Sequence, residues 1–281
     1  MVKRILTAVI AIPLGVLVIL LDYMPLYVAF FSAVSLISVY ELLIASKYTG
    51  NKLLSVVSIV FAAATPTIFI IPVLHKHLVW LFSTFVLFLF IILLFKHDRI
   101  QFEQLSLCAF ISIAIPLAYS SFLFLRETFP QHGQFLMLFI LITTWMADAG
   151  AYFVGTFIGK HPFAPKISPK KTWEGFIGGI VIGTLSGVAT AFVYLLIDTQ
   201  LNGHATFEIN IPYICVISAV MTILAVVGDL SASIIKRQCS VKDFGNLMPG
   251  HGGVLDRFDS VLFVAPFVYQ LFSFFSPFTQ I

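Results

Sequence analysis

The chain has 281 residues, of which 59% are hydrophobic and 10% are charged, and its mean hydropathy is +1.02. Soluble domains carry about 45–50% apolar and about 25% charged residues, so this composition excludes an ordinary water-soluble domain and indicates a protein embedded in a bilayer. The 16 basic and 13 acidic residues leave a net charge of +3, an excess too small to indicate a nucleic-acid-binding protein. The three cysteines lie far apart, so they predict neither a disulfide framework nor a metal site.

Nine apolar stretches are each long enough to cross the hydrocarbon core as a helix, which takes about 17–25 residues. They span residues 5–21, 25–45, 53–73, 78–95, 105–125, 135–157, 175–197, 211–230 and 255–275. Because helices satisfy their own backbone hydrogen bonds where no water is present, we predict an all-α, polytopic integral membrane protein with about nine transmembrane helices. No small-residue cleavage site follows the first stretch, so we interpret it as a membrane helix rather than a signal peptide.

The distribution of basic residues predicts the orientation, since Lys and Arg near helix ends are retained on the cytoplasmic side. With nine crossings and the N-terminus inside, 14 of the 16 Lys and Arg residues fall on that side, all except Lys76 and Arg126. The C-terminus is then outside. We expect one membrane-embedded domain over residues 1–281, with N-terminal helices in 1–130 and the functional helices in 131–281.

Two predicted cytoplasmic loops, residues 158–174 and 231–254, carry seven of the 14 inner basic residues together with Pro, Gly, Ser and His. We therefore expect the chemistry at this face. Ser168, which precedes a proline, is expected to begin the next helix, whose N-terminus favours a phosphate. Lys170 and Lys171 are then candidate ligands for a lipid phosphate or a triphosphate; the alternative is that they anchor the chain on anionic lipid headgroups.

Ionisable groups inside a bilayer are costly, and those retained pair with one another, face a polar cavity or carry function. Six acids fall within predicted helices or at their ends, toward the cytoplasmic half: Glu41, Asp148, Glu174, Asp229, Asp256 and Asp259. Asp148 is the deepest, about nine residues or roughly 13 Å from the inner end of its helix, which suggests a water-filled cleft. The alternative for these acids is an interhelical salt bridge with Lys or Arg, which is what we expect for Glu41.

The densest group of charges begins at Asp229. If the eighth predicted helix continues beyond this residue, Ser233, Lys236 and Arg237 follow at i+4, i+7 and i+8 and share one helical face with it. Residues 249–253 then form a Pro-Gly-His-Gly-Gly segment. Its glycines predict tight turns in which backbone N–H groups are directed at an anion.

Asp256, Arg257 and Asp259 are expected to begin the ninth helix, where the two acids are i, i+3 neighbours on one face. Carboxylates that converge from two helices form an oxygen-rich site suited to Mg²⁺, which is usually held by one or two carboxylates, waters and substrate phosphates. Neighbouring bases take the phosphate charge that the metal does not neutralise. These residues indicate a site for a nucleotide–metal complex; the alternative is that Asp229 only forms an ion pair on its own helix.

Four glycines, Gly175, Gly179, Gly183 and Gly187, recur every four residues in the seventh predicted helix. This small-xxx-small pattern lets two membrane helices approach closely. The partner helix is left open between this chain and a second subunit.

The segment from Ser233 to Asp259 resembles the signature of the phosphatidate cytidylyltransferases, also called CDP-diacylglycerol synthases. The shared pattern is Ser233-x-Ile235-Lys236-Arg237, then Lys242-Asp243-x-Gly245, then Pro249-x-His251-Gly252-Gly253-Val254-x-Asp256-Arg257-Phe258-Asp259. Residues 168–175 are similar to that family's preceding cytoplasmic loop, and the nine-helix plan fits its architecture. The resemblance implies the reaction CTP + phosphatidate → CDP-diacylglycerol + pyrophosphate, dependent on Mg²⁺, in phospholipid biosynthesis.

The resemblance also implies a role for each candidate residue. Asp229 and Asp256 hold the metal, Asp259 is a lesser candidate ligand, and Asp148 is a candidate for a second cation. The residues expected to neutralise the triphosphate, or to shape the turn against it, are Lys236, Arg237, Lys242, His251, Gly252, Gly253 and Arg257. Those expected to bind the lipid phosphate or the departing pyrophosphate are Ser168, Lys170 and Lys171.

The expected partners are CTP, phosphatidate and membrane lipids, with a homodimer left open. The expected location is the bacterial inner membrane, with the site at its cytoplasmic face. Two other functional classes stay open. A secondary transporter also carries intramembrane acids, but near the midplane and often in paired repeats. A different cytidylyl- or phosphoryl-transfer enzyme, acting on a polyprenol or ether lipid, needs similar groups.

Overall fold

The computed structural model describes residue 13, residues 15–248 and residues 252–280. The chain forms two compact units. The first comprises the described residues up to Phe124 together with Lys236–Phe258, and the second comprises those of Leu125–Ile235 and Asp259–Ile281. Each unit therefore combines segments that are distant in the sequence.

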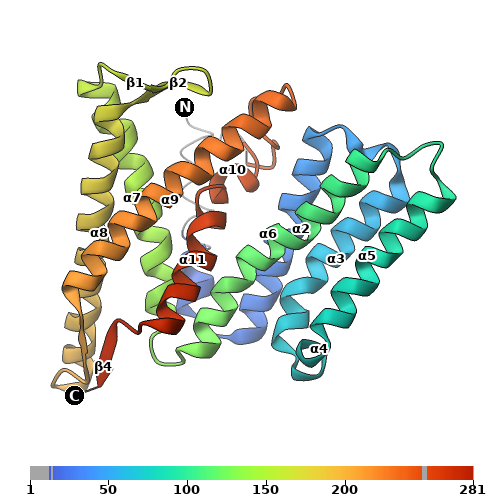
Figure 1. Ribbon diagram of the computed structural model, residues 1–281. Helices are drawn as coiled ribbons and strands as arrows, with labels where there is room; N and C mark the ends of the chain where they lie inside the picture. Colours follow the sequence, from blue (N-terminus) through green and yellow to red (C-terminus); the bar gives the residue numbers. More distant parts are fainter. Residues whose placement is uncertain (1–12, 14, 249–251, 281) are drawn as a thin grey trace. The chain divides into compact units, whose positions relative to one another are not determined.

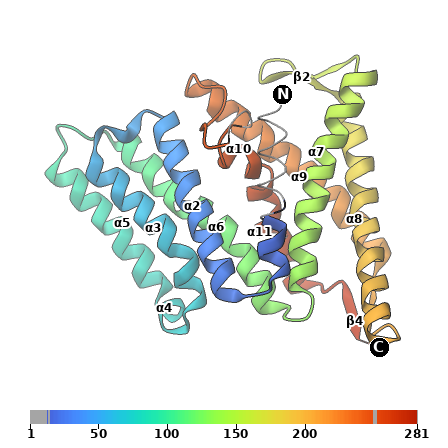
Figure 2. The ribbon, with the colours of Figure 1, turned by 180° about the vertical axis from the view of Figure 1, so that it is seen from behind.

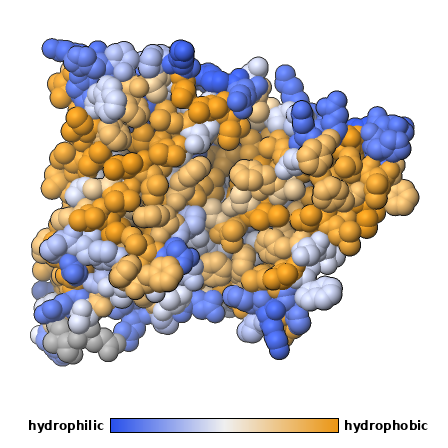
Figure 3. All heavy atoms as spheres, viewed as in Figure 1, coloured by the Kyte–Doolittle hydropathy of each residue, from blue (hydrophilic) through white to orange (hydrophobic). Residues whose placement is uncertain are grey.

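Within the described residues, seven helices are long and apolar enough to cross a membrane. They are α2 (Met24–Ala45), α3 (Lys52–Ile70), α5 (Leu78–Phe95), α6 (Phe102–Thr128), α7 (Gly133–Ile158), α8 (Trp173–Asn202) and α9 (Ile211–Gln238) (Figure 1). On the face shown in Figure 3, hydrophobic side chains cover the middle of these helices and hydrophilic ones gather near their ends. The prediction of an all-α, multi-pass membrane protein is confirmed; the first predicted stretch, 5–21, lies largely outside the described residues.

The ninth predicted stretch is not one helix. α10 covers Leu255–Phe258, α11 covers Val261–Phe274, and a turn at Asp259 and Ser260 separates them. The Asp259 carboxylate accepts the Ser260 backbone N–H at 2.8 Å, and such local bonds compete with helical hydrogen bonds. The prediction of a continuous helix over residues 255–275 is therefore wrong, and the expected pairing of two acids on its face depended on it.

The helices of the first unit pack through aromatic rings and interhelical hydrogen bonds. α2, α3 and α5 lie side by side in both views (Figures 1 and 2), joined by the short 3₁₀ helix Tyr48–Gly50 and by α4 (Pro72–Lys76). Phe31 of α2 stacks on Phe122 of α6 with ring centroids 5.0 Å apart. Two turns further along α2, the Ser38 hydroxyl lies 3.0 Å from the Tyr119 hydroxyl of α6. Because lipid tails are as apolar as the helices, such contacts hold the unit together.

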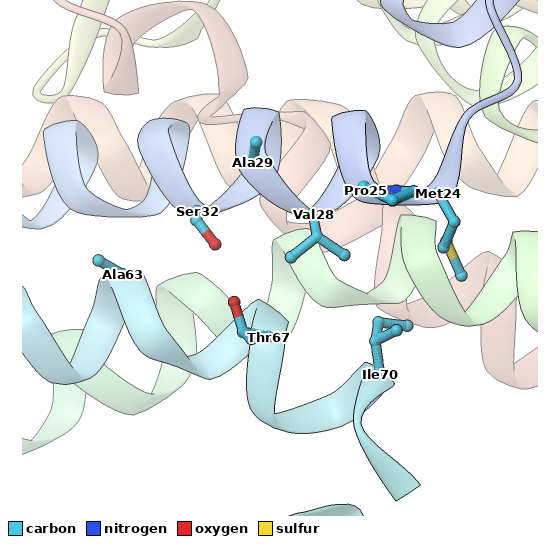
Figure 4. Close-up of a pocket in the computed structure, with 8 residues that line it drawn as sticks. All are labelled: Met24, Pro25, Val28, Ala29, Ser32, Ala63, Thr67 and Ile70. Atoms are coloured by element: carbon cyan, nitrogen blue, oxygen red, sulfur yellow. The ribbon is translucent and has the colours of Figure 1, made fainter.

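A cavity of about 500 Å³ lies between α2 and α3 in the first unit (Figure 4). Its lining is apolar except for Ser32 and Thr67, whose hydroxyl groups point toward each other. It lies near the start of α2, beside Met24 and Pro25. A nucleotide triphosphate needs charged partners that this lining does not offer, so the candidate site is elsewhere in the chain.

The second unit is built on a close approach of α7 and α8. The four stripe glycines are buried in α8: Gly175, Gly179, Gly183 and Gly187. A Cβ atom added at Gly175 would lie 2.7 Å from the carbonyl oxygen of Ala151, and one added at Gly179 would lie 3.1 Å from that of Ala147. Cβ atoms added at Gly183 and Gly187 would lie nearest to side-chain oxygens of α9. The stripe therefore packs on two helices of the same chain, α7 and α9, and this packing occupies the face that a second subunit would need.

Two small antiparallel sheets complete the second unit. β1 (Pro162–Ala164) pairs with β2 (Ser168–Thr172) in the connection between α7 and α8. β3 (Phe207–Ile209), which lies between α8 and α9, pairs with β4 (Phe278–Gln280) near the end of the chain. The first of these sheets carries candidate site residues, and the second joins the segment after α11 to the α8–α9 connection.

His132, at the start of α7, is half-buried against the β3–β4 sheet. Its ring stacks on Phe278 with centroids 3.8 Å apart, and its Nδ1 lies 2.9 Å from the Tyr194 hydroxyl oxygen. Burial lowers the pKa of His132 below its usual value, although the nearby Asp198 carboxylate opposes the shift. The folded second unit therefore favours the neutral imidazole.

Acidification should destabilise the protein through His132. The unfolded chain takes up the proton near pH 6.5, and the folded chain takes it up only at lower pH, so the stabilising contribution is present above about pH 6.5 and is lost as the pH falls toward the folded pKa. The thermal midpoint of the purified protein should fall between about pH 7.5 and about pH 5.5. His132→Phe should show a smaller fall; an equal fall in both proteins would contradict the assignment.

Candidate active site

Asp256 lies in the first turn of α10 and is the best-bonded acid of the first unit. Its Oδ1 accepts a hydrogen bond from Lys236 Nζ at 2.9 Å. Its Oδ2 accepts the backbone N–H groups of Phe244 at 2.8 Å and Gly253 at 2.9 Å. Only 4% of this side chain is exposed. Asp256 therefore joins the middle of the loop that leads from α9 to α10 to the end of that loop, in addition to carrying charge.

Lys236 occupies the last turn of α9, where the helix dipole favours a cation. Its side chain is 14% exposed, and Nζ lies 5.2 Å from the centroid of the Phe244 ring. The ring, the dipole and Asp256 together stabilise a buried ammonium group. Lys236 is therefore placed to meet an anion that approaches Asp256.

The turn before α10 needs glycine at position 252. Gly252 has φ +86°, and a Cβ atom there would lie 2.9 Å from Asp256 Oδ2. Its carbonyl accepts the Met248 backbone N–H at 3.0 Å. His251, predicted to shape the same turn, lies outside the described residues.

Three further predicted phosphate ligands of the first unit are exposed: Arg237, Lys242 and Arg257. α9 runs to Gln238, eight residues beyond the predicted end of the apolar stretch, which satisfies the condition for placing Ser233, Lys236 and Arg237 on one helical face with Asp229. The loop after α9 consequently begins at residue 239 rather than 231. All three bases are exposed to solvent, so a polyanion can approach them.

Asp229 is the candidate metal ligand of the second unit. Its Oδ2 lies 2.5 Å from Lys171 Nζ, and the two side chains are 32% and 25% exposed, respectively. Lys171 comes from β2, nearly sixty residues earlier in the chain. The ion pair therefore joins the predicted lipid-phosphate loop to the helix of the predicted metal ligand.

Two more carboxylates lie near this ion pair. Asp148 of α7 is within electrostatic range of Asp229, Asp259 and Lys171. The Ser260 hydroxyl lies 3.4 Å from Asp148 Oδ2 and is its hydrogen-bond donor. Three acids with one lysine leave excess negative charge, so this group has the composition of a cation site.

α9 passes close to the Asp259–Ser260 turn at Gly228. A Cβ atom there would lie 2.8 Å from the Asp259 carbonyl oxygen and 3.0 Å from Ser260 Cα. Both are backbone atoms, so neither can move as a flexible side chain would. Gly228 therefore sets the spacing between Asp229, the next residue of α9, and the turn that carries Asp259.

Gly228→Ala should separate α9 from that turn and destabilise the protein by about 1–3 kcal/mol, the usual cost of overpacking. Gly15→Ala is the control, because among the described residues its Cβ would meet only Phe30 Cζ, at 4.0 Å, in a helical stretch. Alanine is the better helix former, so the control should be neutral or slightly stabilising. Thermal unfolding in detergent measures both variants, and unchanged stability of Gly228→Ala would contradict the packing argument.

Ser168 does not begin a helix as predicted. It lies in β2, and α8 begins at Trp173 with Thr172 as its N-cap, whose side chain accepts the Gly175 backbone N–H at 3.1 Å. The physical reason is that the residue before a proline is biased toward extended backbone, and Pro169 follows Ser168. The predicted helix-dipole site at Ser168 is therefore wrong.

Lys170 and Lys171 are neighbours in β2, so their side chains leave opposite faces of the strand. Lys171 is partly buried on Asp229, whereas Lys170 is exposed. Glu174 fixes the same loop, because it accepts the Lys160 backbone N–H at 3.1 Å and lies 2.5 Å from His161 Nδ1. The structure thus brings only one of the two lysines to a candidate metal ligand.

Sequence analysis missed the role of Glu41, for which it predicts a salt bridge. The Glu41 carboxylate accepts the backbone N–H groups of Val254 and Leu255, and within the described part of the chain no Lys or Arg pairs with it. The salt-bridge prediction is therefore wrong. The sequence held no signal for this role, because the amide donors lie more than two hundred residues away in the chain.

The candidate residues form two groups, one in each unit. Asp256, Lys236 and Gly253 are together in the first, and Asp148, Asp229, Asp259 and Lys171 are together in the second. That Asp229 and Asp256 share one metal stays a prediction.

Asp229 and Asp256 offer carboxylate oxygens, the ligands that Mg²⁺ prefers. No three His, Cys, Asp or Glu side chains of the described residues are arranged as a ready-made metal site. Mg²⁺ needs only one or two carboxylates, because waters and substrate phosphates complete its shell. Asp229 is open enough to bind it, and Asp256 can do so through Oδ1 if Lys236 moves to the phosphates. The donor set therefore fits the metal.

Comparison with known proteins agrees with this chemistry. The family model described as "Cytidylyltransferase family" matches residues 2–275. A phosphatidate cytidylyltransferase of Bacillus subtilis is 39% identical over 181 residues, which cover 64% of this chain and 62% of the relative. One of Haemophilus influenzae is 42% identical over 146 residues, 52% and 48% of the two chains. One of Staphylococcus saprophyticus is 35% identical over 169 residues, 60% and 59%.

The matched region spans less than two thirds of the length of each of these relatives. The family match, in contrast, extends over nearly all of this chain and includes every candidate site residue. The chain therefore belongs to the cytidylyltransferase family.

Proposed function

We propose that this chain transfers the cytidylyl group of CTP to phosphatidate, which yields CDP-diacylglycerol and pyrophosphate in bacterial phospholipid synthesis. The observation that carries the proposal is that each candidate metal acid is paired with a lysine, Asp229 with Lys171 at 2.5 Å and Asp256 with Lys236 at 2.9 Å. Acids for a metal and bases for phosphates are what a reaction between two polyanions requires. The names of the relatives supply the substrates.

The reaction joins two anions. Its barrier comes largely from their repulsion and from the need to align the attacking oxygen with the leaving group. An oxygen of the phosphatidate phosphate attacks the α-phosphorus of CTP, a new P–O bond forms, and the bond from the α-phosphorus to the bridging oxygen breaks. Pyrophosphate leaves with that electron pair. The nucleophile is a phosphate monoester, already ionised near pH 7 because its second pKa is about 6, so no general base is needed. The protein's contribution is charge neutralisation and positioning.

The positions suggest how the residues divide this work. Lys236, Arg237 and Lys242 neutralise the triphosphate, and the turn with His251, Gly252, Gly253 and Arg257 lies against it. Ser168, Lys170 and Lys171 bind the lipid phosphate or the departing pyrophosphate. Two observations support this division. Lys171 and Lys236 form ion pairs with the candidate metal ligands. The other bases are exposed to solvent: Arg237, Lys242, Arg257 and Lys170.

We also propose Mg²⁺ as the cofactor, held by Asp229 and Asp256, with Asp259 a lesser ligand. When bound, it would neutralise charge on the phosphates. Asp148 is the candidate ligand for a second cation, since it lies within electrostatic range of Asp229 and Asp259. Removal of divalent cations with a chelator should abolish activity, and added Mg²⁺ should restore it.

The proposed setting is the bacterial inner membrane, with the N-terminus and the site on the cytoplasmic side. The excess of basic residues in the predicted inner loops supports this orientation. A homodimer stays a prediction, and the glycine stripe, packed on α7 and α9, does not supply its interface.

An assay with radiolabelled CTP tests the proposal. The purified protein is incubated with phosphatidate, with a polyprenol, or without lipid, each with and without Mg²⁺. Label should enter lipid only with phosphatidate and Mg²⁺, with one pyrophosphate released per lipid. Labelling of the polyprenol instead would assign a different transferase, and no labelling under any condition would overturn cytidylyl transfer and return the transporter to consideration.

A further inference from the structure

Glu41 is a buried carboxylate near the C-terminal end of a membrane-spanning helix, and it has no role in the proposed reaction so far described. It lies in α2, and the residue is 4% exposed. Its Oε1 accepts the Val254 backbone N–H at 3.0 Å, and its Oε2 accepts the Leu255 backbone N–H at 2.9 Å. More than two hundred residues separate Glu41 from these donors, so the contact is tertiary.

A buried carboxylate is costly unless donors satisfy it, and both oxygens of Glu41 are satisfied by main-chain amides. These amides belong to the segment that enters α10, immediately before Asp256. Glu41 therefore fixes the backbone that leads into a candidate metal ligand. Charge-assisted bonds of this kind are about twice as strong as neutral ones.

Two glycines of the signature make room for this carboxylate. A Cβ atom added at Gly245 would lie 2.6 Å from Glu41 Cδ, and one added at Gly253 would lie 2.5 Å from it. Each position thus excludes any side chain while Glu41 is present. Glu41 therefore contacts the loop between α9 and α10 at its middle and near its end.

The same loop is bonded to Asp256. Asp256 accepts the backbone N–H groups of Phe244 and Gly253, next to the residues that contact Glu41. Two carboxylates therefore bind consecutive amides of one loop, Asp256 taking Gly253 and Glu41 taking Val254 and Leu255. Because Glu41 and Asp256 bind neighbouring amides of one backbone segment, a shift of Glu41 also shifts the backbone to which Asp256 is bonded.

We infer that Glu41 is a positioning residue, which holds the α9–α10 loop so that Asp256 and its partner Lys236 are placed for cytidylyl transfer. This inference rests on the proposed function. Glu41 touches no substrate in this account: its donors are all backbone amides of the loop. Its effect on the reaction passes through Asp256, as an outer-shell partner acts through a metal ligand.

Glu41→Gln is the main test, because it keeps the volume and replaces one acceptor oxygen with an amide NH₂ that faces a backbone N–H. The kcat/KM for CTP should fall about 10–100-fold and the Mg²⁺ concentration for half-maximal activity should rise, as for other lost outer-shell partners. Hydrogen exchange should accelerate in the peptide that contains Val254 and Leu255.

Ser38→Ala is the matched control. Ser38 lies one turn before Glu41 in the same helix, is fully buried, and forms a hydrogen bond with Tyr119 rather than with the loop. Its loss should lower the thermal midpoint without changing the Mg²⁺ requirement or the exchange of the loop. A general structural role of Glu41 would instead give the same pattern in both variants.

Gly245→Ala is a second route to the same contact and serves if Glu41→Gln does not fold. This variant keeps the Glu41 carboxylate, but its added methyl group would displace that carboxylate from the loop side of the contact. It should therefore reproduce the raised Mg²⁺ requirement. The double variant should be no worse than the poorer single variant, because both act on one contact. Additive losses would overturn the inference.

The outcomes separate the two proposals. If the wild type transfers cytidylyl groups and Glu41→Gln stays within twofold of it, or loses activity with no change in loop exchange, the positioning role is overturned. If the wild type labels no phosphatidate, the proposed function fails, whereas loop exchange in Glu41→Gln still decides whether Glu41 holds the loop.

Discussion

Asp229→Asn should lower the incorporation of CTP into lipid by about 10²–10³-fold, the range for losing a preorganised electrostatic group, while membrane insertion stays intact. The amide keeps the volume of a side chain that is 32% exposed, so folding is little affected. It removes the charge that the metal needs and that neutralises Lys171. Asp229→Ala should behave in the same way.

Two comparisons make the Asp229 result specific. Asp198→Asn removes a carboxylate from α8 of the same unit, where it accepts the Thr206 backbone N–H at 2.8 Å, and it should keep near wild-type turnover. Lys171→Met should lose less activity than Asp229→Asn, and the double variant should resemble Asp229→Asn alone, because the two residues form one ion pair. Near wild-type turnover of purified Asp229→Asn would refute the metal assignment.

Asp256→Asn should abolish activity and also destabilise the fold. The Asp256 and Lys236 side chains are 4% and 14% exposed, so removal of one charge leaves the other buried without its partner. Breaking such a buried pair typically costs about 3–5 kcal/mol. The amide oxygen of the variant can still accept a backbone N–H of the loop. Thermal unfolding and CTP incorporation are measured on the same preparation.

The double variant Lys236→Met/Asp256→Asn separates the structural from the chemical role of the pair. It removes both charges, so most of the lost stability should return, and Met fills the space of the lysine stem beside Phe244. Activity should stay absent, because the carboxylate and the ammonium are both missing. Recovery of activity together with stability would show that Asp256 only supports the fold.

The sequence was sufficient to predict the spans and the chemical types. Seven predicted apolar stretches correspond to membrane-length helices, because hydropathy is a sum over neighbours in the chain and does not depend on tertiary contacts. Glycines at a fixed spacing also predicted close helix packing, because the spacing along the chain is enough to place them on one helical face. The signature residues predicted acids, bases and tight turns near one another, and Gly252 does adopt the left-handed backbone of such a turn.

The sequence was a poor guide where local hydrogen bonds compete with a helix. Ser168 precedes Pro169 and lies in a strand, and the Asp259 side chain bonds to the next backbone N–H where a continuous helix was predicted. Hydropathy does not register either effect, since it counts side-chain polarity and not backbone conformation.

Composition and spacing by themselves determined that this chain is a multi-pass membrane protein with acids and bases gathered in two segments. Only the tertiary structure decided the partners: Lys171 for Asp229, Lys236 for Asp256, and backbone amides rather than a lysine for Glu41. The physical reason is range. Apolar runs and helical faces follow from residues a few positions apart, whereas the partner of a buried charge is whichever donor the packing of distant helices brings within about 3 Å.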